Sequence, residues 1–413
     1  MNKGQKETGR LSGYLLLLLI CSLVVSFCSA SAETKTDGWT VTRAWEKYKN
    51  GPPADPNFFP ILVWLQSPSN AVKYKAAGFN TYFGLHKGPS AGQIETLKAA
   101  GMYLVCEMNE EALKHRDDKT IIGWMTFDEP ENFATKAPLE VNGKTWNYGP
   151  ATSRISAKDI GEMYEVIKKE DSTRPVWLNF SCGVANDKYH GRGSGWKNSM
   201  YPDYMKAADV VGFDVYPTSS VGENTHWLHA RGLDRMKEWA GPEKPRFNFF
   251  GPTFTGKGRK PTTEEFRTEV WISIIHGTKG LAYFAHNFKP KFQEAALLAD
   301  AEMLAAVTKI NTQVTELAPV INGPDSDGVA VTVEKEAVPV DILIKKYKEE
   351  TYIFSAAMKQ AETAAVSFQV KGVTAAGKVQ VLGEDRTLDI DATGKFKDEF
   401  KTWGSHVYKV VKN

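Results

Sequence analysis

The sequence predicts an α/β fold, a (β/α)8 TIM barrel followed by a small C-terminal β-sandwich. Short apolar runs alternate with helical patterns, and this unit recurs through the first three quarters of the chain, as in parallel (β/α)8 sheets. Beyond Ala318, apolar and polar residues alternate with period two in runs separated by glycine and aspartate, as in antiparallel strands. We expect the barrel to span residues 58–318 and the sandwich 319–413, after a lead-in segment, 33–57.

The expected barrel strands are apolar runs, each stopped by a turn signal, a pattern typical of buried strands. The fourth run begins IIGWM at Ile121 and stops before Pro130, because proline cannot donate to a strand ladder. In chain order, the runs cover 58–66, 79–86, 102–109, 121–129, 175–181, 210–217, 246–254 and 280–288.

Helical patterns lie between these runs, and glycine ends the first two. Ser156 is expected to cap a helix through Glu170, and Pro261 with Thr262 precedes acids in a typical helix start. A long helical tract is expected over 290–317. A doubly wound sheet is disfavoured, because the turn at 66–69 lacks the glycine-rich phosphate loop of that fold.

The N-terminus is typical of a secretory signal peptide. Basic residues precede an apolar run over 15–27, and Ala30 to Ala32 supply a cleavage site. We expect cleavage near Ala32, a secreted or periplasmic mature chain, and no membrane insertion afterwards, since the run is short for a span. An uncleaved anchor is the alternative. A lipoprotein at Cys28 is disfavoured because Phe27 is bulky where a small residue is needed.

The net charge of the chain limits the classes of binding partner, and its cysteines bear on possible disulfides. Removing residues 1–32 removes the excess positive charge, so the mature chain is close to neutral. Neutrality argues against nucleic acid or an anionic membrane as a partner. Cys106 and Cys182 lie in apolar runs and are interpreted as small core residues, although a disulfide between them stays open. No metal-ligand spacing or cofactor motif is present in the sequence, and oligomeric state is not readable.

The carboxyl ends of barrel strands are where chemistry collects in this fold. Acids, amides, histidines and aromatic residues follow the expected strands. The candidates there are Trp64, His86, Glu107, Asn109, Asp128, Glu129, Asn179, Asp214, Tyr216 and His286, with Trp124 inside the fourth strand. Aromatic faces stack on sugar rings while amides, histidines and acids hold hydroxyls, so this set indicates a carbohydrate site. Cleavage of a glycosidic bond needs two carboxyl groups with different roles.

The turn Asp128-Glu129-Pro130 after the fourth strand resembles the setting of the acid/base glutamate in clan-A-like (β/α)8-barrel glycoside hydrolases. The tract from Pro261 to Phe288 is similar to the corresponding part of bacterial β-galactosidase-like and related uncharacterised barrels. The resemblance covers about residues 58–319 and the attached sandwich. It implies that Glu129 is the general acid/base, and we expect burial behind the strand and nearby Asp128 to raise its pKa.

The second carboxylate departs from that pattern, because the seventh run, FNFFGPTF, ends without an acid. Glu264 and Glu265 instead suit the first turn of a helix. Asp214 is the best substitute as nucleophile or base, with Glu107 or Asp128 next. A carboxyl separation of about 5 Å indicates retention of configuration and about 6.5–9.5 Å indicates inversion.

We therefore expect a secreted glycoside hydrolase that cleaves a neutral polysaccharide or its oligosaccharides, with Glu129 and Asp214 as catalytic residues. The other candidates (Trp64, His86, Asn109, Trp124, Asp128, Asn179, Tyr216 and His286) would position the sugar. The first alternative is a barrel that binds carbohydrate without cleaving it, having lost the strand-seven nucleophile. The second is a structural cell-surface protein with no sugar site.

Overall fold

The structure, a computed structural model, describes residues 44–132, 155–189, 197–327, 339–360 and 362–411. It also gives the backbone of five short strands: β1 (Lys35–Thr36), β2 (Trp39–Thr40), β7 (Leu139–Val141), β8 (Lys144–Trp146) and β13 (Val329–Val333). The predicted signal peptide, with Cys28 and Ala32, lies outside the described residues. Within the described part, no helix is long and apolar enough to cross a membrane.

Eight parallel strands close into a barrel in the order β10-β11-β12-β3-β4-β5-β6-β9, which confirms the predicted fold class. Their side chains are buried on both faces almost throughout, as expected for short apolar runs in a parallel sheet. The bounds are β3 Ile61–Trp64, β4 Thr81–Phe83, β5 Tyr103–Glu107, β6 Ile121–Met125, β9 Val176–Phe180, β10 Val210–Asp214, β11 Arg246–Phe250 and β12 Leu281–Tyr283.

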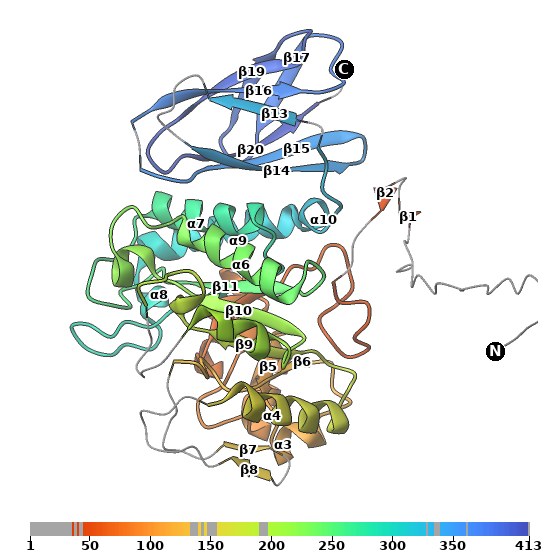
Figure 1. The fold of residues 1–413 in the computed structure, drawn as a ribbon, viewed down its shortest axis with the longest axis vertical. Coiled ribbons are helices and arrows are strands. Elements are labelled where there is room, and N and C mark those ends of the chain that lie inside the picture. The colour runs from red at the N-terminus through yellow and green to blue at the C-terminus, as the bar shows by residue number, and fades with distance from the viewer. Residues whose placement is uncertain are drawn as a thin grey trace, which may run out of the picture.

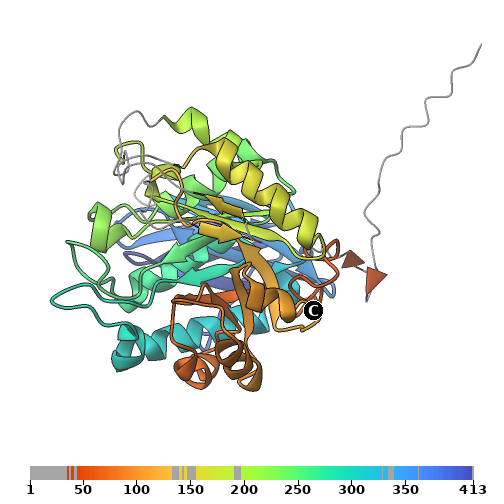
Figure 2. The same ribbon diagram turned by 90° about the horizontal axis from the view of Figure 1, so that it is seen from below.

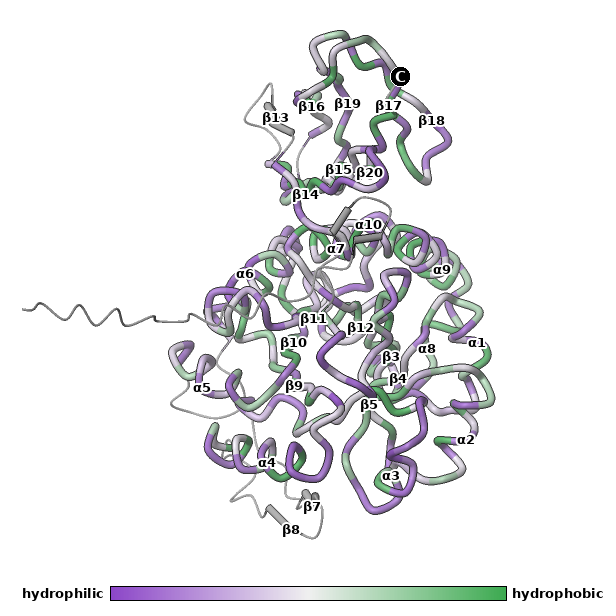
Figure 3. The backbone as a smooth tube through the Cα atoms, turned by 90° about the vertical axis from the view of Figure 1, so that its right-hand side faces the viewer, coloured by the Kyte–Doolittle hydropathy of each residue, from purple (hydrophilic) through white to green (hydrophobic). Residues whose placement is uncertain are grey.

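Helices surround the strands, as Figure 3 shows along the barrel. The predicted helix at Ser156 is confirmed: the Ser156 side chain accepts a hydrogen bond from the Asp159 N–H and caps α4. The helices are α1 Ala71–Ala76, α2 Ala91–Ala99, α3 Glu110–Lys114, α4 Ala157–Glu170, α5 Tyr201–Met205, α6 Leu228–Ala240, α7 Thr263–Ile275, α8 Ala296–Ala299, α9 Ala301–Glu316 and α10 Ala318–Ile321.

The long helical tract expected over 290–317 is wrong in its first part. The chain instead forms a loop after β12, in which Asn287 and Gln293 pair as an antiparallel bridge. Helical structure begins only with α8, and Asp300 then caps α9 by accepting from the Met303 N–H at 3.1 Å. The bridge and Pro290 compete with helix formation, because both use the backbone in ways that a helix cannot.

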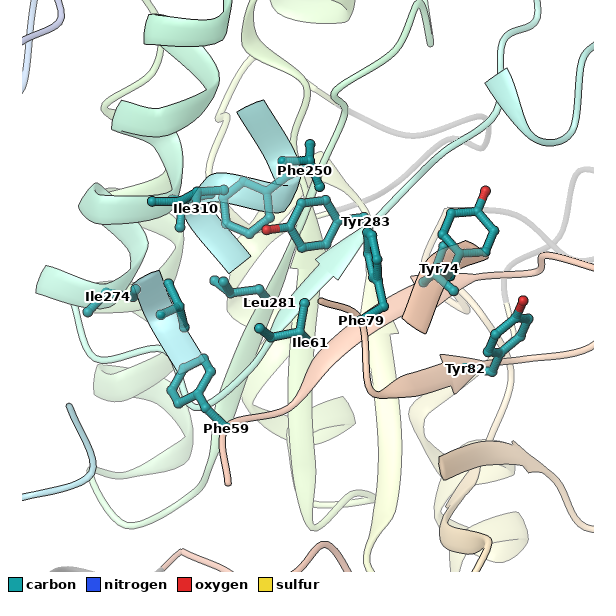
Figure 4. Close-up of a cluster of buried hydrophobic side chains, with 14 of the residues drawn as sticks. Phe59, Ile61, Tyr74, Phe79, Tyr82, Phe250, Ile274, Leu281, Tyr283 and Ile310 are labelled. Carbon is teal, nitrogen blue, oxygen red and sulfur yellow. The ribbon is translucent and has the colours of Figure 1, made fainter. Parts of the chain in front are cut away.

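Aromatic side chains fill the barrel interior. The Trp177 ring lies 5.9 Å from that of Phe83 and 5.2 Å from that of Phe247, measured between centroids. The interior is therefore a packed core and not a channel. A second cluster packs the outside of β3 and β12 against α7 and α9, with Phe59, Ile61, Ile274, Leu281 and Ile310 among its members (Figure 4).

The C-terminal part is a two-sheet β-sandwich that lies against α7 and α10 (Figure 1). Figure 2 shows its blue strands behind the barrel. Arg267 of α7 donates to Ser405, and Thr268 donates to the Trp403 carbonyl, which joins the two parts. One sheet has the order β14-β15-β20-β17-β18 and the other β13-β16-β19. The bounds are β14 Val340–Tyr347, β15 Glu350–Ala357, β16 Ala364–Val370, β17 Gly377–Val381, β18 Arg386–Ile390, β19 Lys395–Phe400 and β20 Ser405–Val410.

The two cysteines of the described residues are both free. Cys106 is buried on β5, as expected for a core residue, and Cys182 is half-buried just after β9. The disulfide that the sequence left open is therefore absent between these two residues.

Candidate active site

The turn after β6 holds Glu129 in an unusual backbone conformation. Its φ of 46° lies in the left-handed region, which residues with a Cβ rarely adopt. The Glu129 N–H donates to the Asn179 carbonyl at 3.0 Å, and the Asn132 N–H donates to the Glu129 carbonyl at 2.9 Å. Such a conformation costs about 1–3 kcal/mol and is enriched at functional sites. The surrounding hydrogen bonds therefore hold Glu129 in place against a local cost.

Asp214, the last residue of β10, meets Glu129 at the carboxyl-terminal edge of the barrel. The two carboxyl groups lie within hydrogen-bonding reach of each other. Burial, the charge and hydrogen bond of Glu129, and the charges of Asp128 and Glu131 raise the pKa of Asp214 well above its ordinary value. Two carboxyls this close share one proton because both cannot be ionised at low cost. The raised pKa makes Asp214 the member of the pair that favours keeping the shared proton.

The side chain of Asn179, at the end of β9, connects the acids. It is 5% exposed, and its Nδ2 donates to Oδ1 of Asp128 at 3.0 Å and to Oδ1 of Asp214 at 3.3 Å. On the other side, Asn132 Nδ2 donates to Glu129 Oε2 at 2.5 Å. The predicted residues Asp128, Glu129, Asn179 and Asp214 are thus brought into one hydrogen-bonded network.

Glu131 belongs to this cluster, although the sequence analysis gave it no role. It is 2% exposed, and burial together with the charge of Glu129 raises its pKa to about 8. Its Oε1 accepts from the Ser181 N–H at 2.6 Å, from Ser181 Oγ at 2.8 Å and from Tyr201 Oη at 3.3 Å. These bonds tie the turn to the end of β9. The signal in the sequence was a third acid within Asp128-Glu129-Pro130-Glu131.

Tyr216 lies beside Asp214, and burial and the neighbouring acids raise its pKa well above the ordinary value. The phenol therefore stays a neutral hydrogen-bond donor. Its ring centroid lies 5.7 Å from that of Phe284.

His286 follows β12 in the chain. It is 5% exposed, and its Nε2 lies 3.2 Å from Gln66 Nε2. Burial lowers the pKa of His286, which keeps the ring neutral.

Three predicted sugar-binding residues have structural roles instead. Trp124 is fully buried on the outer side of β6, where its Nε1 donates to Asp171 at 3.0 Å, so the sugar-binding prediction is wrong. Asn109 is also wrongly assigned, because its side chain accepts from the Ala112 N–H and donates to the Pro89 carbonyl, which caps α3. Trp64 packs edge-on against Phe83 and Phe249 in the barrel core and is only 7% exposed, so it offers no open face.

Two candidates lie apart from the acid cluster. His86 is exposed on the loop after β4, where its backbone carbonyl accepts from Gln93. The Glu107 side chain ends β5 and is open to solvent, yet the surrounding protein raises the pKa of its carboxyl. Glu107 is therefore a solvent-accessible carboxyl group that lies apart from the acid cluster.

Comparisons with known proteins agree with the fold. A scan against protein-family models finds no match, and a search of curated proteins finds none either. Among solved structures, an AmyP variant in complex with maltotriose and AmyP in complex with maltose each align with a TM-score of 0.51 and 8% identity. The alignments cover 86% of this chain and 97% and 96% of those chains. A glucosidase from Croceicoccus marinus aligns at 8% identity with a TM-score of 0.49, covering 89% of this chain and 98% of its own. At such identity the AmyP likeness establishes a shared fold.

Proposed function

We propose that this chain is a secreted glycoside hydrolase that cleaves O-glycosidic bonds of a polysaccharide or its oligosaccharides, with a neutral sugar at the cleaved bond. The proposal rests chiefly on one observation: Glu129 and Asp214 form a hydrogen-bonded carboxyl pair at the carboxyl-terminal edge of the barrel, in which the pKa of Asp214 is raised. A buried, proton-sharing pair at the carboxyl-terminal edge of a (β/α)8 barrel is suited to general acid catalysis. Several carboxyl groups around the pair disfavour an anionic sugar at that position.

The proton is the first requirement of the reaction. Protonation of the glycosidic oxygen lets the bond to the anomeric carbon break with the sugar leaving as an alcohol. In the proposed mechanism Asp214 stores the proton in the free protein and Glu129 is the acid/base that exchanges it with the glycosidic oxygen. From the sequence, Asp214 was expected to act as nucleophile or base beside Glu129. In this mechanism Asp214 instead stores the proton that Glu129 transfers.

The second requirement is a carboxylate on the other side of the sugar. Retaining and inverting enzymes separate their two carboxyls by about 5–5.5 Å and 6.5–9.5 Å, which both exceed hydrogen-bond contact. Glu129 and Asp214 therefore do not flank the sugar while they remain paired. Glu107, which is open to solvent, and Asp128, held by Asn179, are the carboxyls that could act as nucleophile or base.

A second candidate function is carbohydrate binding without cleavage. The observation that favours it is the end of β11, the seventh barrel strand. Phe249, Phe250 and Gly251 lie there, and none of them can act as a nucleophilic carboxylate. Glu265, the nearest predicted acid, accepts two hydrogen bonds from Arg259 at 2.7 Å in the first turn of α7 and is thereby committed to structure.

The test is a screen of residues 33–413 against neutral and acidic polysaccharides and aryl glycosides, with product detected by chromatography. Glu129→Gln is compared with Glu316→Gln, which changes an exposed glutamate at the end of α9. We expect product from the parent chain and the Glu316 variant, and a loss of about 10²- to 10⁴-fold in the Glu129 variant. Binding without product from any of the three would favour the second candidate.

The same substrate then identifies the second carboxylate. Glu107→Gln and Asp128→Asn are assayed with and without azide, a small anion that replaces a missing carboxylate nucleophile. The variant whose activity azide restores, with a glycosyl azide as product, lacks the nucleophile. Restoration in neither variant would assign an inverting reaction with water as the attacking group.

A further inference from the structure

The loop after β12 exposes two large aromatic side chains. Phe288 is 51% exposed and Phe292 is 60% exposed. Only two other large hydrophobic side chains within the described residues are exposed, Val72 and Met200. Two phenylalanines so close together in solvent leave apolar area uncovered that contact with a ligand would bury. Their placement therefore calls for a ligand and not for folding alone.

The loop is fixed at its base. The Asn287 N–H donates to the Gln293 carbonyl and the Gln293 N–H donates back to the Asn287 carbonyl, both at 2.9 Å. Asn287 Oδ1 also accepts from the Phe254 N–H at 2.7 Å, which attaches the loop to the segment after β11. Between these anchors the ring centroids of Phe288 and Phe292 lie 5.8 Å apart, with their planes at 39°. The two rings thus form a preorganised pair.

A series of ring contacts connects this pair to the acid cluster. The Phe288 ring lies 5.7 Å from the Phe284 ring, and Phe284 in turn lies 5.7 Å from Tyr216. Tyr216 is the residue beside Asp214. Phe292 also stacks on His286 at 5.7 Å with an interplanar angle of 26°. The exposed rings are therefore continuous with the proposed active site.

Polar groups accompany the rings. The base of the loop borders a cavity of about 360 Å³, whose lining includes Lys260, Asn287, Gln293 and Asp300. Such polar groups near the base of the loop suit the hydroxyl edge of a sugar ring, while the exposed rings suit its apolar C–H faces.

We propose that Phe288 and Phe292 form a stacking platform for sugar units of a glycan chain beyond the cleaved bond. This inference rests on the proposed function and deepens it: the substrate is a chain that extends over the β12 loop, not a small glycoside. The recognised chemistry is the apolar face of a pyranose ring. Neutral and acidic glycans share it, and the exposed Lys289 and Lys291, which lie between the two phenylalanines in the sequence, would add affinity for an acidic chain.

The binding test uses Glu129→Gln as the parent, so that bound glycan is not consumed. Titration calorimetry measures its affinity for the polysaccharides of the panel, neutral and acidic, and for oligosaccharides of increasing length. Phe288→Ala with Phe292→Ala is the test variant, Phe288→Trp is the conservative variant, and Val72→Ala removes an exposed apolar side chain on α1. All four are checked for an unchanged melting temperature.

We expect the double alanine variant to bind long chains about tenfold more weakly or worse, from the loss of two stacking contacts. Affinity for the shortest ligands stays the same, and the tryptophan and Val72 variants bind like the parent. A larger loss for acidic than for neutral chains would assign the lysines a part in recognition. Equal affinity of parent and double variant, or a parent that binds none of the panel, overturns the platform.

Two further arms separate this inference from the proposed function. In a chain with Glu129 intact, the double variant should lower kcat/KM on polymer but not on aryl glycosides. A platform that affects binding while no chain shows product would support the platform and reject hydrolysis. A loss of binding to lipid vesicles instead of glycans would show that the rings serve a membrane surface, which contradicts the inference.

Discussion

The carboxyl groups of Glu129 and Asp214 share a hydrogen bond across the edge of the barrel, where β6 and β10 end. Neither residue is explained by folding alone: Glu129 has a strained backbone, and Asp214 is an acid whose pKa is raised by burial and by neighbouring carboxyl groups. Each would be costly in a purely structural role. Together they form a proton donor that is set before any substrate arrives.

The pair predicts a specific pH dependence. The raised pKa of Asp214 extends the proton-bearing form of the pair to higher pH, so loss of this proton lowers activity on the alkaline side. Asp214→Asn removes the storage site, and the alkaline limb of kcat/KM should move to lower pH. Asp203→Asn, at an exposed aspartate of α5, is the control and should leave the profile unchanged. An Asp214 variant with the parent profile would contradict the shared proton.

Substitutions at Trp124 and Tyr216 should have opposite effects: the first should change stability and the second the pH dependence of activity. Trp124→Phe removes the hydrogen bond to buried Asp171 and should lower the free energy of unfolding by about 1–2 kcal/mol, with KM and kcat unchanged. Tyr216→Phe removes a donor beside Asp214 and should change the pH profile with little effect on stability. Urea denaturation and steady-state kinetics on both variants measure this. A changed KM in Trp124→Phe would return that residue to the sugar site.

Buried Glu269 should make stability depend on pH. It lies on α7 at 1% exposure, with Oε1 at 3.4 Å from His226 Nε2 and Oε2 at 3.6 Å from His229 Nε2. Burial raises its pKa from 4.5 to about 8. The folded chain therefore binds more protons than the unfolded chain between these values, and this group's contribution to stability falls as pH rises through that window.

Glu269→Gln removes that dependence. The melting temperature of the variant relative to the parent should rise steadily from about pH 5 to about pH 8, because Gln never has to be ionised in the core. Glu264→Gln, at the exposed acid in the first turn of the same helix, provides the comparison. A constant difference between the Glu269 variant and the parent across this range would show that Glu269 is ionised in the folded protein.

The order of the strands and the positions of their ends could be predicted from the sequence. Which side chains of a strand point into the barrel could not. Asp128, Glu129, Asn179 and Asp214 were placed correctly because each follows an apolar run, and the ends of parallel strands meet at one edge of a barrel. Trp124 was misplaced because β6 is buried on both faces, so its pattern does not reveal which side chains point inward. Asn109 has the sequence context of a helix cap, a simpler role than sugar binding.

The loop after β12 could not be predicted from local sequence patterns, because tertiary contacts determine its conformation. Residues 290–295 were assigned to the helical tract expected over 290–317. The pairing of Asn287 with Gln293 and the bond from Phe254 to Asn287 are tertiary contacts, which no local propensity predicts. The exposed rings of Phe288 and Phe292 become visible only when that loop is known.

The most direct measurement is a carbon-13 NMR titration of the side-chain carboxyls of residues 33–413, labelled at Asp and Glu, with Glu129→Gln and Asp214→Asn for assignment. It requires no substrate. The account predicts that at about pH 7 the Asp214 carboxyl still has the chemical shift of a protonated acid, and that its titration changes when Glu129 is replaced. An Asp214 carboxyl that is fully ionised at that pH, and indifferent to Glu129→Gln, would contradict the proton-sharing pair and with it the proposed mechanism.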